Sequence, residues 1–410
     1  MNNNNNSNSN NNNSKKYKVL AESNGSYLVT RNLNATFNDI MVSGFIVNKD
    51  GKIISPELPI GTLTKDGYWH IINGNYEDLI SSNNDYIRDA LLGAAVGDAY
   101  GVPYEFLSRA EISKLELGDM IGNDNNPGFV SRWSKAIPSG AWSDDTSMIV
   151  ATMEAICANR SINYDSIMNN YLRWWNEGKY SSLEFPFGLG GVVNKSLVRY
   201  ANGVSPTECG GRDFMDNGNG SLMRILPFSI YCIENDLDDN ETLDFITKAS
   251  SLTHGNEISI MACFMYTIFL KELVRTRNKN MAFSAMIFTK YENYFSKETV
   301  ERFKRINNPN FYLKIEDINE SGYVIDTLET VMYSIMSSNS YRETIENCIK
   351  VGYDTDTSAC IAGSLAGVLY GYENIPKEWL DKLKRREYLE GLSEKYSRTL
   401  ETMKLSKKRI

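Results

Sequence analysis

The sequence predicts an all-α core preceded by a small N-terminal β-rich appendage. From about residue 86 onward, the chain contains long apolar segments of helical length, with few helix breakers and no strand-like alternation. Before residue 80, short runs rich in Val, Ile, Tyr and Thr alternate with turn residues, which is typical of a small sheet. The chain has 410 residues, 42% of them hydrophobic, so it can bury a large core and contain more than one domain.

The N-terminal part has two different compositions. Residues 1–14 are almost all Asn and Ser and cannot bury enough apolar surface to fold, so we expect a disordered tract. Residues 15–80 are expected to form the β-rich appendage, with a hairpin turn at 48–51. The expected strands lie in the segments 26–31, 40–48, 52–55 and 68–73.

Residues 86–400 are expected to form one all-α domain. Several of its segments are apolar on nearly every side, which is typical of central helices in a bundle. The expected helices are 87–101, 146–160, 164–178, 254–274, 323–336, 341–352 and 357–371.

Two of these helices carry a small residue at every fourth position. This spacing places the small residues on one face, where another backbone can approach closely. The approaching backbone can be that of a neighbouring helix, or the face can receive a ligand. The small residues are Gly93, Gly97 and Gly101 in the first helix, and Ala359, Gly363 and Gly367 in the last.

Composition excludes several classes of function. A formal net charge of −8 argues against a surface that binds nucleic-acid backbones. The two histidines, His70 and His254, are too few for a His-rich zinc site. The six cysteines have no paired spacing, which favours reduced thiols in a cytoplasmic protein. We expect no signal peptide or membrane segment, because the longest apolar stretch, 258–270, is too short to span a bilayer.

Two acidic clusters occupy short polar gaps, each before an apolar helix. A single acid or hydroxyl residue at such a position can cap the helix and complement its dipole. Capping explains two neighbouring acids poorly because like charges repel, whereas a divalent cation such as Mg²⁺ or Mn²⁺ favours carboxylate and hydroxyl ligands. The first cluster contains Ser143, Asp144 and Asp145, and the second contains Asp354, Asp356 and Thr357.

Other polar segments lie between these clusters and around them. Asp98 and Glu105 flank Pro103, which is expected to end a helix and leave Glu105 on a loop, where it is either functional or an ordinary surface carboxylate. Backbone amides in glycine-rich segments before helices suit an anionic group such as a pyrophosphate. His254 lies at another helix start, as a cap or a ligand contact, and His70 is expected to be structural or exposed. The glycine-rich segments contain Gly188, Gly190 and Gly191, and then Asp216, Gly218, Asn219, Gly220 and Ser221.

Taken in order, seven motifs resemble the ADP-ribosylglycohydrolase family over roughly residue 86 to the C-terminus. They are GDAYGVPYEF, GAWSDDTSM, FGLGGVVNKSL, GNGSLMR, THGNE, GYVIDTLE and DTDTSACIAGSLAGVLYG. The resemblance implies an ADP-ribosylglycohydrolase-like all-α fold with two Mg²⁺ or Mn²⁺ ions in a central cleft. By motif, it implies the metal ligands Ser143, Asp144, Asp145, Asp354, Asp356 and Thr357.

The resemblance also implies the reaction. It implies a hydrolase that cleaves the glycosidic bond between ADP-ribose and a modified protein side chain, with arginine slightly favoured as the acceptor. Glu105, Asp144 and Asp145 would handle protons, and both glycine segments and His254 would contact the ADP-ribose. Tyr353 stands where the family commonly has Gly, which bears on loop shape and substrate preference.

Two alternatives stay open at this point. The chain would be an ADP-ribose-binding or toxin-neutralising protein if the appendage binds a protein partner and catalysis is secondary. It would be a metal phosphoesterase acting on a nucleotide if similar metal ligands support cleavage of a phosphoester bond. Residues 275–320 match none of the family's motifs.

Overall fold

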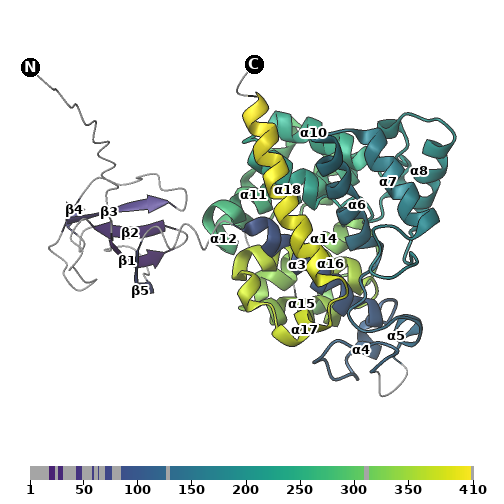
Figure 1. Ribbon diagram of the computed structural model, residues 1–410, viewed down its shortest axis with the longest axis horizontal. Helices are drawn as coiled ribbons and strands as arrows, with labels where there is room; N and C mark the ends of the chain where they lie inside the picture. Colours follow the sequence, from purple (N-terminus) through teal and green to yellow (C-terminus); the bar gives the residue numbers. More distant parts are fainter. Residues whose placement is uncertain are drawn as a thin grey trace, which may run out of the picture. The chain divides into compact units, whose positions relative to one another are not determined.

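The structure is a computed structural model in which the chain forms two compact units, Met1–Asn84 and Asp85–Ile410 (Figure 1). The predicted Asn/Ser tract at 1–14, the strand expected at 52–55 and positions 49–51 of the expected turn lie outside the described residues. The described residues are 18–23, 26–30, 43–48, 58–59, 63, 70–75, 85–125, 130–308 and 314–407.

The first unit contains an antiparallel five-stranded sheet in the order β4-β3-β2-β1-β5. In β1, Ala21 lies opposite Leu28 of β2, and the register shifts between Val19 and Ala21. Leu20, Ala21 and Leu28 are buried together and form a small core. The strands β2 and β3 fall within predicted segments, β5 overlaps the segment predicted at 68–73, and β1 and β4 were not expected. The strands are β1 (Lys18–Ser23), β2 (Ser26–Thr30), β3 (Ser43–Asn48), β4 (Leu58–Pro59) and β5 (His70–Asn75).

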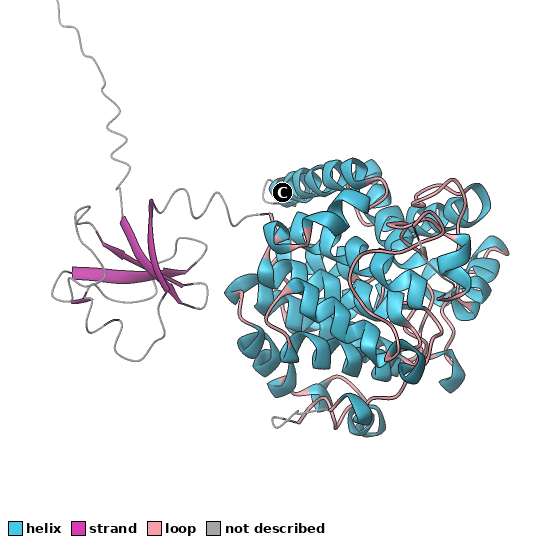
Figure 2. Cartoon of the chain, turned by 90° about the horizontal axis from the view of Figure 1, so that it is seen from below, coloured by secondary structure: helices cyan, strands magenta, loops and turns pink. Residues whose placement is uncertain are grey.

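The second unit is built of helices joined by loops (Figure 2). All seven predicted helices are present, as α3, α6, α7, α11, α14, α15 and α16, so the predicted all-α core is confirmed. The helices are α3 (Tyr86–Gly101), α4 (Arg109–Ile112), α5 (Arg132–Ala136), α6 (Asp144–Asn159), α7 (Tyr164–Glu177), α8 (Gly191–Ala201), α9 (Leu226–Glu234), α10 (Asp239–Ser251), α11 (Glu257–Thr276), α12 (Lys279–Phe288), α13 (Lys297–Arg302), α14 (Val324–Ser337), α15 (Tyr341–Val351), α16 (Thr355–Tyr370), α17 (Lys377–Lys382) and α18 (Arg386–Lys407).

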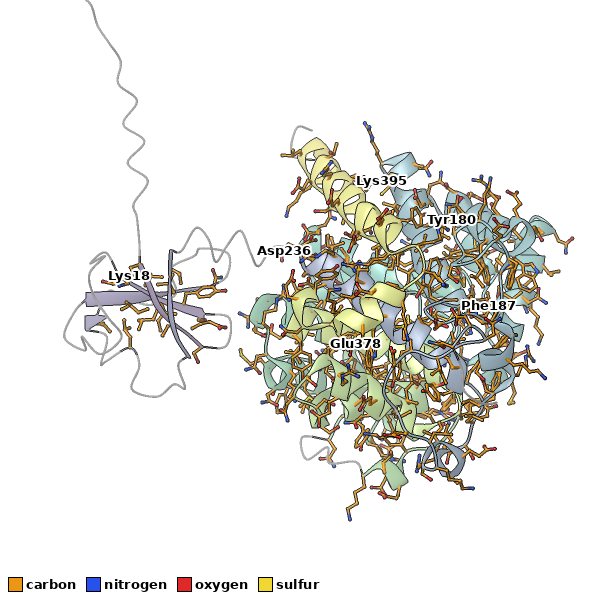
Figure 3. The ribbon with its side chains drawn as sticks, turned by 60° about the horizontal axis from the view of Figure 1, so that its bottom comes forward. Lys18, Tyr180, Phe187, Asp236, Glu378 and Lys395 are labelled. Atoms are coloured by element: carbon orange, nitrogen blue, oxygen red, sulfur yellow. The ribbon has the colours of Figure 1, made fainter. Side chains whose placement is uncertain are left out.

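The centre of this unit is formed by α3, α11, α14 and α16, whose side chains are buried over most of their length. They belong to one continuous hydrophobic cluster, and charged side chains such as Glu378 and Lys395 lie on the outside (Figure 3). Among the described residues, no helix combines the length and the apolar character needed to cross a membrane.

Candidate functional site

The small-residue stripes of α3 and α16 face each other and bring the two helix backbones into contact. A Cβ atom added at Gly97 would lie 2.0 Å from the carbonyl oxygen of Ala359, and one added at Gly93 would lie 2.2 Å from that of Gly363. Only glycine permits so close an approach. Of the two readings of these stripes, helix packing is therefore the one that the structure bears out, and it places Asp98 on α3 beside Asp356 on α16.

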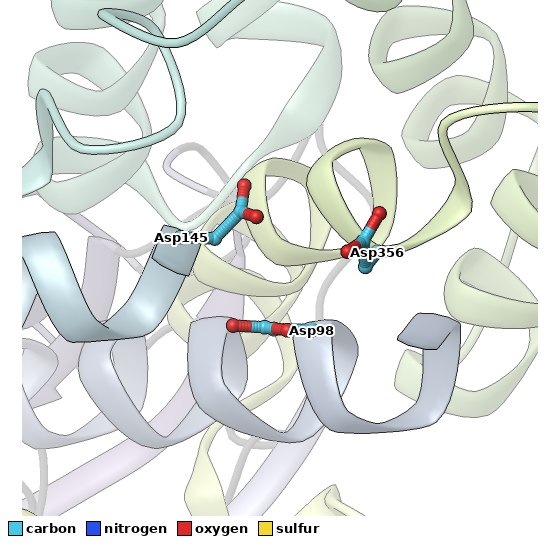
Figure 4. A group of neighbouring side chains, drawn as sticks. All are labelled: Asp98, Asp145 and Asp356. Carbon is cyan, nitrogen blue, oxygen red and sulfur yellow. The ribbon is translucent and has the colours of Figure 1, made fainter. Parts of the chain in front are cut away.

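Three helices each contribute one buried carboxylate to a common point (Figure 4). Asp98 of α3, Asp145 of α6 and Asp356 of α16 each offer an oxygen, and these three oxygens lie within 4.8 Å of one another. Glu105 and Asp354 form a second group with Asp356 under the same distance limit. Because Asp356 belongs to both groups, the two acidic clusters predicted from the sequence form one continuous acidic centre.

Asp98 anchors the start of α6 against α3. Its carboxylate accepts hydrogen bonds from the backbone N–H of Ser143 (2.9 Å), the backbone N–H of Thr146 (3.0 Å) and the Thr146 hydroxyl (2.6 Å). Burial raises the pKa of Asp98 to about 6, and these hydrogen bonds oppose the rise. The sequence marked Asp98 as an acid but gave it no place in the site. Its role depends on a contact with Ser143, which lies 45 residues further along the chain on another element.

Asp145 carries an oxygen with no partner. Its Oδ2 atom accepts a hydrogen bond from the Ser143 hydroxyl (2.9 Å), whereas its buried Oδ1 atom has no hydrogen-bond partner among the described residues. Burial raises the pKa of Asp145, and the neighbouring Asp98 and Asp354 raise it further. A buried, unpaired anionic oxygen is costly unless a cation compensates it.

Helix capping accounts for little of this chemistry. Ser143 is the N-cap residue of α6, and its hydroxyl accepts the backbone N–H of Asp145 (3.3 Å). Asp354 is the N-cap residue of α16, but its side chain makes no capping hydrogen bond. Instead, its Oδ2 atom accepts a hydrogen bond from the Asn219 side chain (2.8 Å). The carboxylates are thus directed into the acidic centre, and Asn219 connects it to the second glycine segment.

Thr357 and Asp144 complete the predicted ligand set. Burial raises the pKa of Asp354, and the Thr357 hydroxyl opposes the rise there and at Asp145. Burial and the neighbouring Asp145 raise the pKa of Asp144. A Cβ atom at Gly188 would lie 2.1 Å from Oδ1 of Asp144, and Gly188 has a φ of +93°. The first glycine segment therefore lies directly against the acidic centre.

Glu105 is a half-buried carboxylate at the edge of this centre. It follows a short 3-10 turn, Val102–Tyr104, after α3 ends at Gly101, as expected from Pro103. The indole N–H of Trp133 donates a hydrogen bond to its Oε2 atom. Burial raises the pKa of Glu105 to about 8, with further contributions from Asp354 and Asp144. Such a group can hold or release a proton near neutral pH, unlike an ordinary surface carboxylate.

The donor set fits hard divalent cations. It consists of carboxylate and hydroxyl oxygens, the ligands that Mg²⁺, Mn²⁺ and Ca²⁺ prefer. The burial of several like charges and the unpaired oxygen of Asp145 would both be relieved by such ions.

The second glycine segment lies over His254. A Cβ atom at Gly220 would lie 2.9 Å from Cε1 of His254, and one at Gly218 would lie 3.7 Å from its Nε2 atom. Asp216 accepts the backbone N–H of Asp213 (3.2 Å) and so helps to shape the loop. The hydroxyl of Ser221 is fully buried and accepts a hydrogen bond from Ser250 (3.0 Å).

Two residues that the sequence did not single out fix the state of His254. Thr253 Oγ1 lies 2.6 Å from a guanidinium nitrogen of the buried Arg224 and 2.9 Å from Nδ1 of His254. The Arg224 guanidinium can only donate, so Thr253 Oγ1 accepts from it and keeps its own proton available for Nδ1. When that proton is donated to Nδ1, the ring proton is on Nε2, on the side of Gly218. Burial, together with the charge of Arg224, lowers the pKa of His254 to about 3, so the ring stays neutral.

Two predicted residues lie farther out on the first glycine segment. Gly190 is the N-cap residue of α8 and makes no side-chain cap, and both Gly190 and Gly191 are exposed. Added Cβ atoms there would meet nothing within 4 Å. Space beside the start of α8 is therefore open, whereas Gly188 lies against the acidic centre.

Comparisons with known proteins agree on one family. The family model for ADP-ribosylglycohydrolase matches residues 81–406. The chain is 30% identical to ADP-ribosylarginine hydrolase Tri1 of Serratia proteamaculans, over 77% of this chain and 79% of that protein. It is 25% identical to the ADP-ribosyl-[dinitrogen reductase] glycohydrolase of Rhodospirillum rubrum, over 74% of this chain and 91% of that one.

A solved structure gives the same result. The protein described as "ADP-ribosylglycohydrolase-related protein complex" superimposes with a TM-score of 0.64 and 28% identity, covering 78% of this chain and 99% of that chain. The matched residues include the acidic centre, both glycine segments and His254. The chain therefore belongs to the ADP-ribosylglycohydrolase family.

Proposed function

We propose that this protein hydrolyses the glycosidic bond between ADP-ribose and a modified protein side chain, releasing free ADP-ribose. The observation that carries the proposal is the acidic centre, in which Asp356 lies in one group of carboxylates with Asp145 and in a second group with Glu105. The carboxylates of such a centre can bind divalent cations, stabilise a positively charged oxocarbenium-like transition state and transfer protons.

Two Mg²⁺ or Mn²⁺ ions are the proposed cofactors. When bound, they would supply Lewis-acid activation of water and orientation of ribose hydroxyls. The proposed ligands are Ser143, Asp144, Asp145, Asp354, Asp356 and Thr357. Asp98 holds the first cluster in place through Ser143 and Thr146, and Asn219 orients Asp354.

The remaining steps use groups of the chain. Glu105, Asp144 and Asp145 are the candidates for taking a proton from water and returning one to the leaving group. Glu105 is best suited to exchange protons, because it is half-buried at the edge of the centre and is not a proposed metal ligand, whereas Asp144 and Asp145 are. Gly190 and Gly191 offer unhindered backbone for the diphosphate and riboses, because added Cβ atoms there would meet nothing within 4 Å, and the neutral His254 directs its Nε2 atom toward Gly218.

An arginine-linked substrate is the preferred acceptor in this proposal. Two relatives, from Serratia proteamaculans and Pseudomonas putida, are named ADP-ribosylarginine hydrolases, whereas more distant relatives are named ADP-ribosylhydrolase ARH3. The expected partner is an ADP-ribosylated protein. A cytoplasmic location is consistent with the six cysteines, all free and buried.

The test measures products from arginine-linked and serine-linked ADP-ribosyl peptides, with Mg²⁺ or Mn²⁺ and with a chelator. Metal-dependent release of free ADP-ribose supports the proposal, and loss of release in Asp356→Ala, with Glu378→Ala as an exposed control, assigns it to the acidic centre. Release of AMP or phosphate would favour the phosphoesterase alternative. Binding without any product would favour a binding protein.

The N-terminal sheet unit can be tested separately. Its own small core and its separate contacts support a role as a recognition module for a protein partner. Removing residues 1–84 should leave turnover of small peptides unchanged, while binding to such a partner is lost. A large loss of turnover on peptides would instead assign the unit to catalysis.

A further inference from the structure

Two exposed aromatic side chains contact each other, and each belongs to a residue next in sequence to an acid of the acidic centre. The side chains of Phe106 and Tyr353 are 55% and 41% exposed, and their rings lie 5.7 Å apart in an edge-to-face arrangement. Phe106 directly follows Glu105, and Tyr353 directly precedes Asp354. The pair is therefore attached to two carboxylates of the same acidic group.

Both residues are held in an unfavourable backbone conformation. Phe106 and Tyr353 each have a φ of +66°, in the left-handed region that bulky residues rarely adopt. Two backbone hydrogen bonds impose it: the N–H of Phe106 donates to the Tyr353 carbonyl (2.6 Å), and the N–H of Tyr353 donates to the Leu107 carbonyl (2.7 Å). Glycine would fit position 353 without strain, so a tyrosine there is costly to the backbone. Strain of this kind is concentrated at ligand clamps and active sites.

We propose that the Phe106–Tyr353 pair binds the guanidinium group of an arginine acceptor and thereby sets the preference for arginine-linked over serine-linked substrates. The inference rests on the proposed hydrolysis of ADP-ribosylated side chains and names the residues that select the acceptor. Guanidinium groups are planar, weakly hydrated cations that stack on aromatic faces, whereas a serine hydroxyl gains little from such a surface.

Charge near the pair also favours a cation. Glu105 and Asp354 are the sequence neighbours of Phe106 and Tyr353, and both belong to one group of carboxylates with Asp356. The protein already stacks a guanidinium on an aromatic ring at this place, because Arg132 lies 4.3 Å from the ring centre of Trp133, the residue that bonds Glu105. A second guanidinium, from the substrate, would meet the same combination of ring and carboxylate at Phe106 and Tyr353.

The experiment compares kcat/KM for arginine-linked and serine-linked peptides of the same sequence in full-length protein. Tyr353→Gly and Phe106→Ala should reduce the arginine-to-serine ratio about 5- to 30-fold, equivalent to about 1–2 kcal/mol, mainly through KM for the arginine substrate. Tyr353→Phe should keep the ratio because it keeps the ring. Phe288→Ala, which removes an aromatic side chain that is 69% exposed on α12, is the matched control and should change nothing.

A binding measurement separates this inference from the proposed reaction. Equilibrium binding of the arginine-linked peptide should weaken in Tyr353→Gly and Phe106→Ala, while binding of free ADP-ribose should not. This binding comparison tests the acceptor assignment even if the wild-type protein releases no ADP-ribose. Absence of release would contradict only the proposed reaction. Equal losses on both peptides, an unchanged ratio, or weaker binding of free ADP-ribose would each overturn the assignment of the pair to the acceptor.

Discussion

The contact between α3 and α16 gives the sharpest prediction for stability. A Cβ atom at Gly97 would lie 2.0 Å from the Ala359 carbonyl oxygen, whereas an ordinary contact begins at 3.4 Å. Gly97→Ala therefore requires the two backbones to separate by about 1.4 Å, the difference between these distances. Overpacking of this kind costs about 1–3 kcal/mol, and we expect the upper end because both partners are backbone in the centre of the unit.

The matched control variant is expected to increase the free energy of unfolding rather than lower it. Gly391 lies within α18, and an added Cβ atom would meet nothing within 4 Å. Gly391→Ala should therefore raise the free energy of unfolding by about 0.5–1 kcal/mol through helix propensity alone. Urea unfolding followed by far-ultraviolet circular dichroism measures both changes, because the helical unit dominates that signal.

The Gly97→Ala variant also tests whether the contact between α3 and α16 positions the acidic centre. Separation of α3 from α16 would move Asp98 away from Asp356, so calorimetry should show weaker Mn²⁺ binding in Gly97→Ala. A Gly97→Ala protein as stable as the wild type would refute the packing argument. A destabilised protein with unchanged Mn²⁺ affinity would show that the contact between α3 and α16 does not position the acidic centre.

Three further predictions concern the buried polar groups. Asp145→Asn should raise the melting temperature of metal-free protein, because it removes a buried charge, and should abolish the extra stability that Mg²⁺ gives; a Mg²⁺ response like that of the wild type would contradict it. Without divalent ions, the free energy of unfolding should fall between about pH 6.5 and 8, above the range in which His254 titrates in the unfolded chain, because the folded state retains the Glu105 proton there. Thermal scans that show a rise over this window would count against this. Thr253→Val should lower the free energy of unfolding by about 1–3 kcal/mol, because Arg224 loses a hydrogen-bond acceptor. It should also weaken ADP-ribose binding, because the ring of His254 loses its partner, and Thr253→Ser should restore both properties.

Local sequence signals predicted much of the fold and of the acidic centre. The seven expected helices are long and apolar, and the clusters around Asp144 and Asp356 directly precede or begin two of them. Helix α18 was not expected because its sequence is highly charged. It nevertheless buries Leu389, Tyr396 and Leu400 at spacings of seven and four residues, a pattern that periodicity alone could have found.

Residues whose roles depend on distant contacts could not be placed from sequence. Asp98 is an acid near the end of an apolar helix, and only its hydrogen bonds to the start of α6 reveal its function. Arg224 is a buried cation held by carbonyl and hydroxyl groups, so no charge pairing marks it in the sequence. Ser221 stays a predicted substrate contact, and its hydroxyl is fully buried and accepts a hydrogen bond from Ser250.

The most direct test of the central claim is product analysis by mass spectrometry after incubation with an arginine-linked ADP-ribosyl peptide. The protein is first stripped of metal and then given Mg²⁺ or Mn²⁺. The proposed metal-dependent hydrolysis should yield free ADP-ribose and unmodified peptide only after metal is restored, and neither product from Asp356→Asn. Full release by the stripped protein, or AMP as the product, would contradict it.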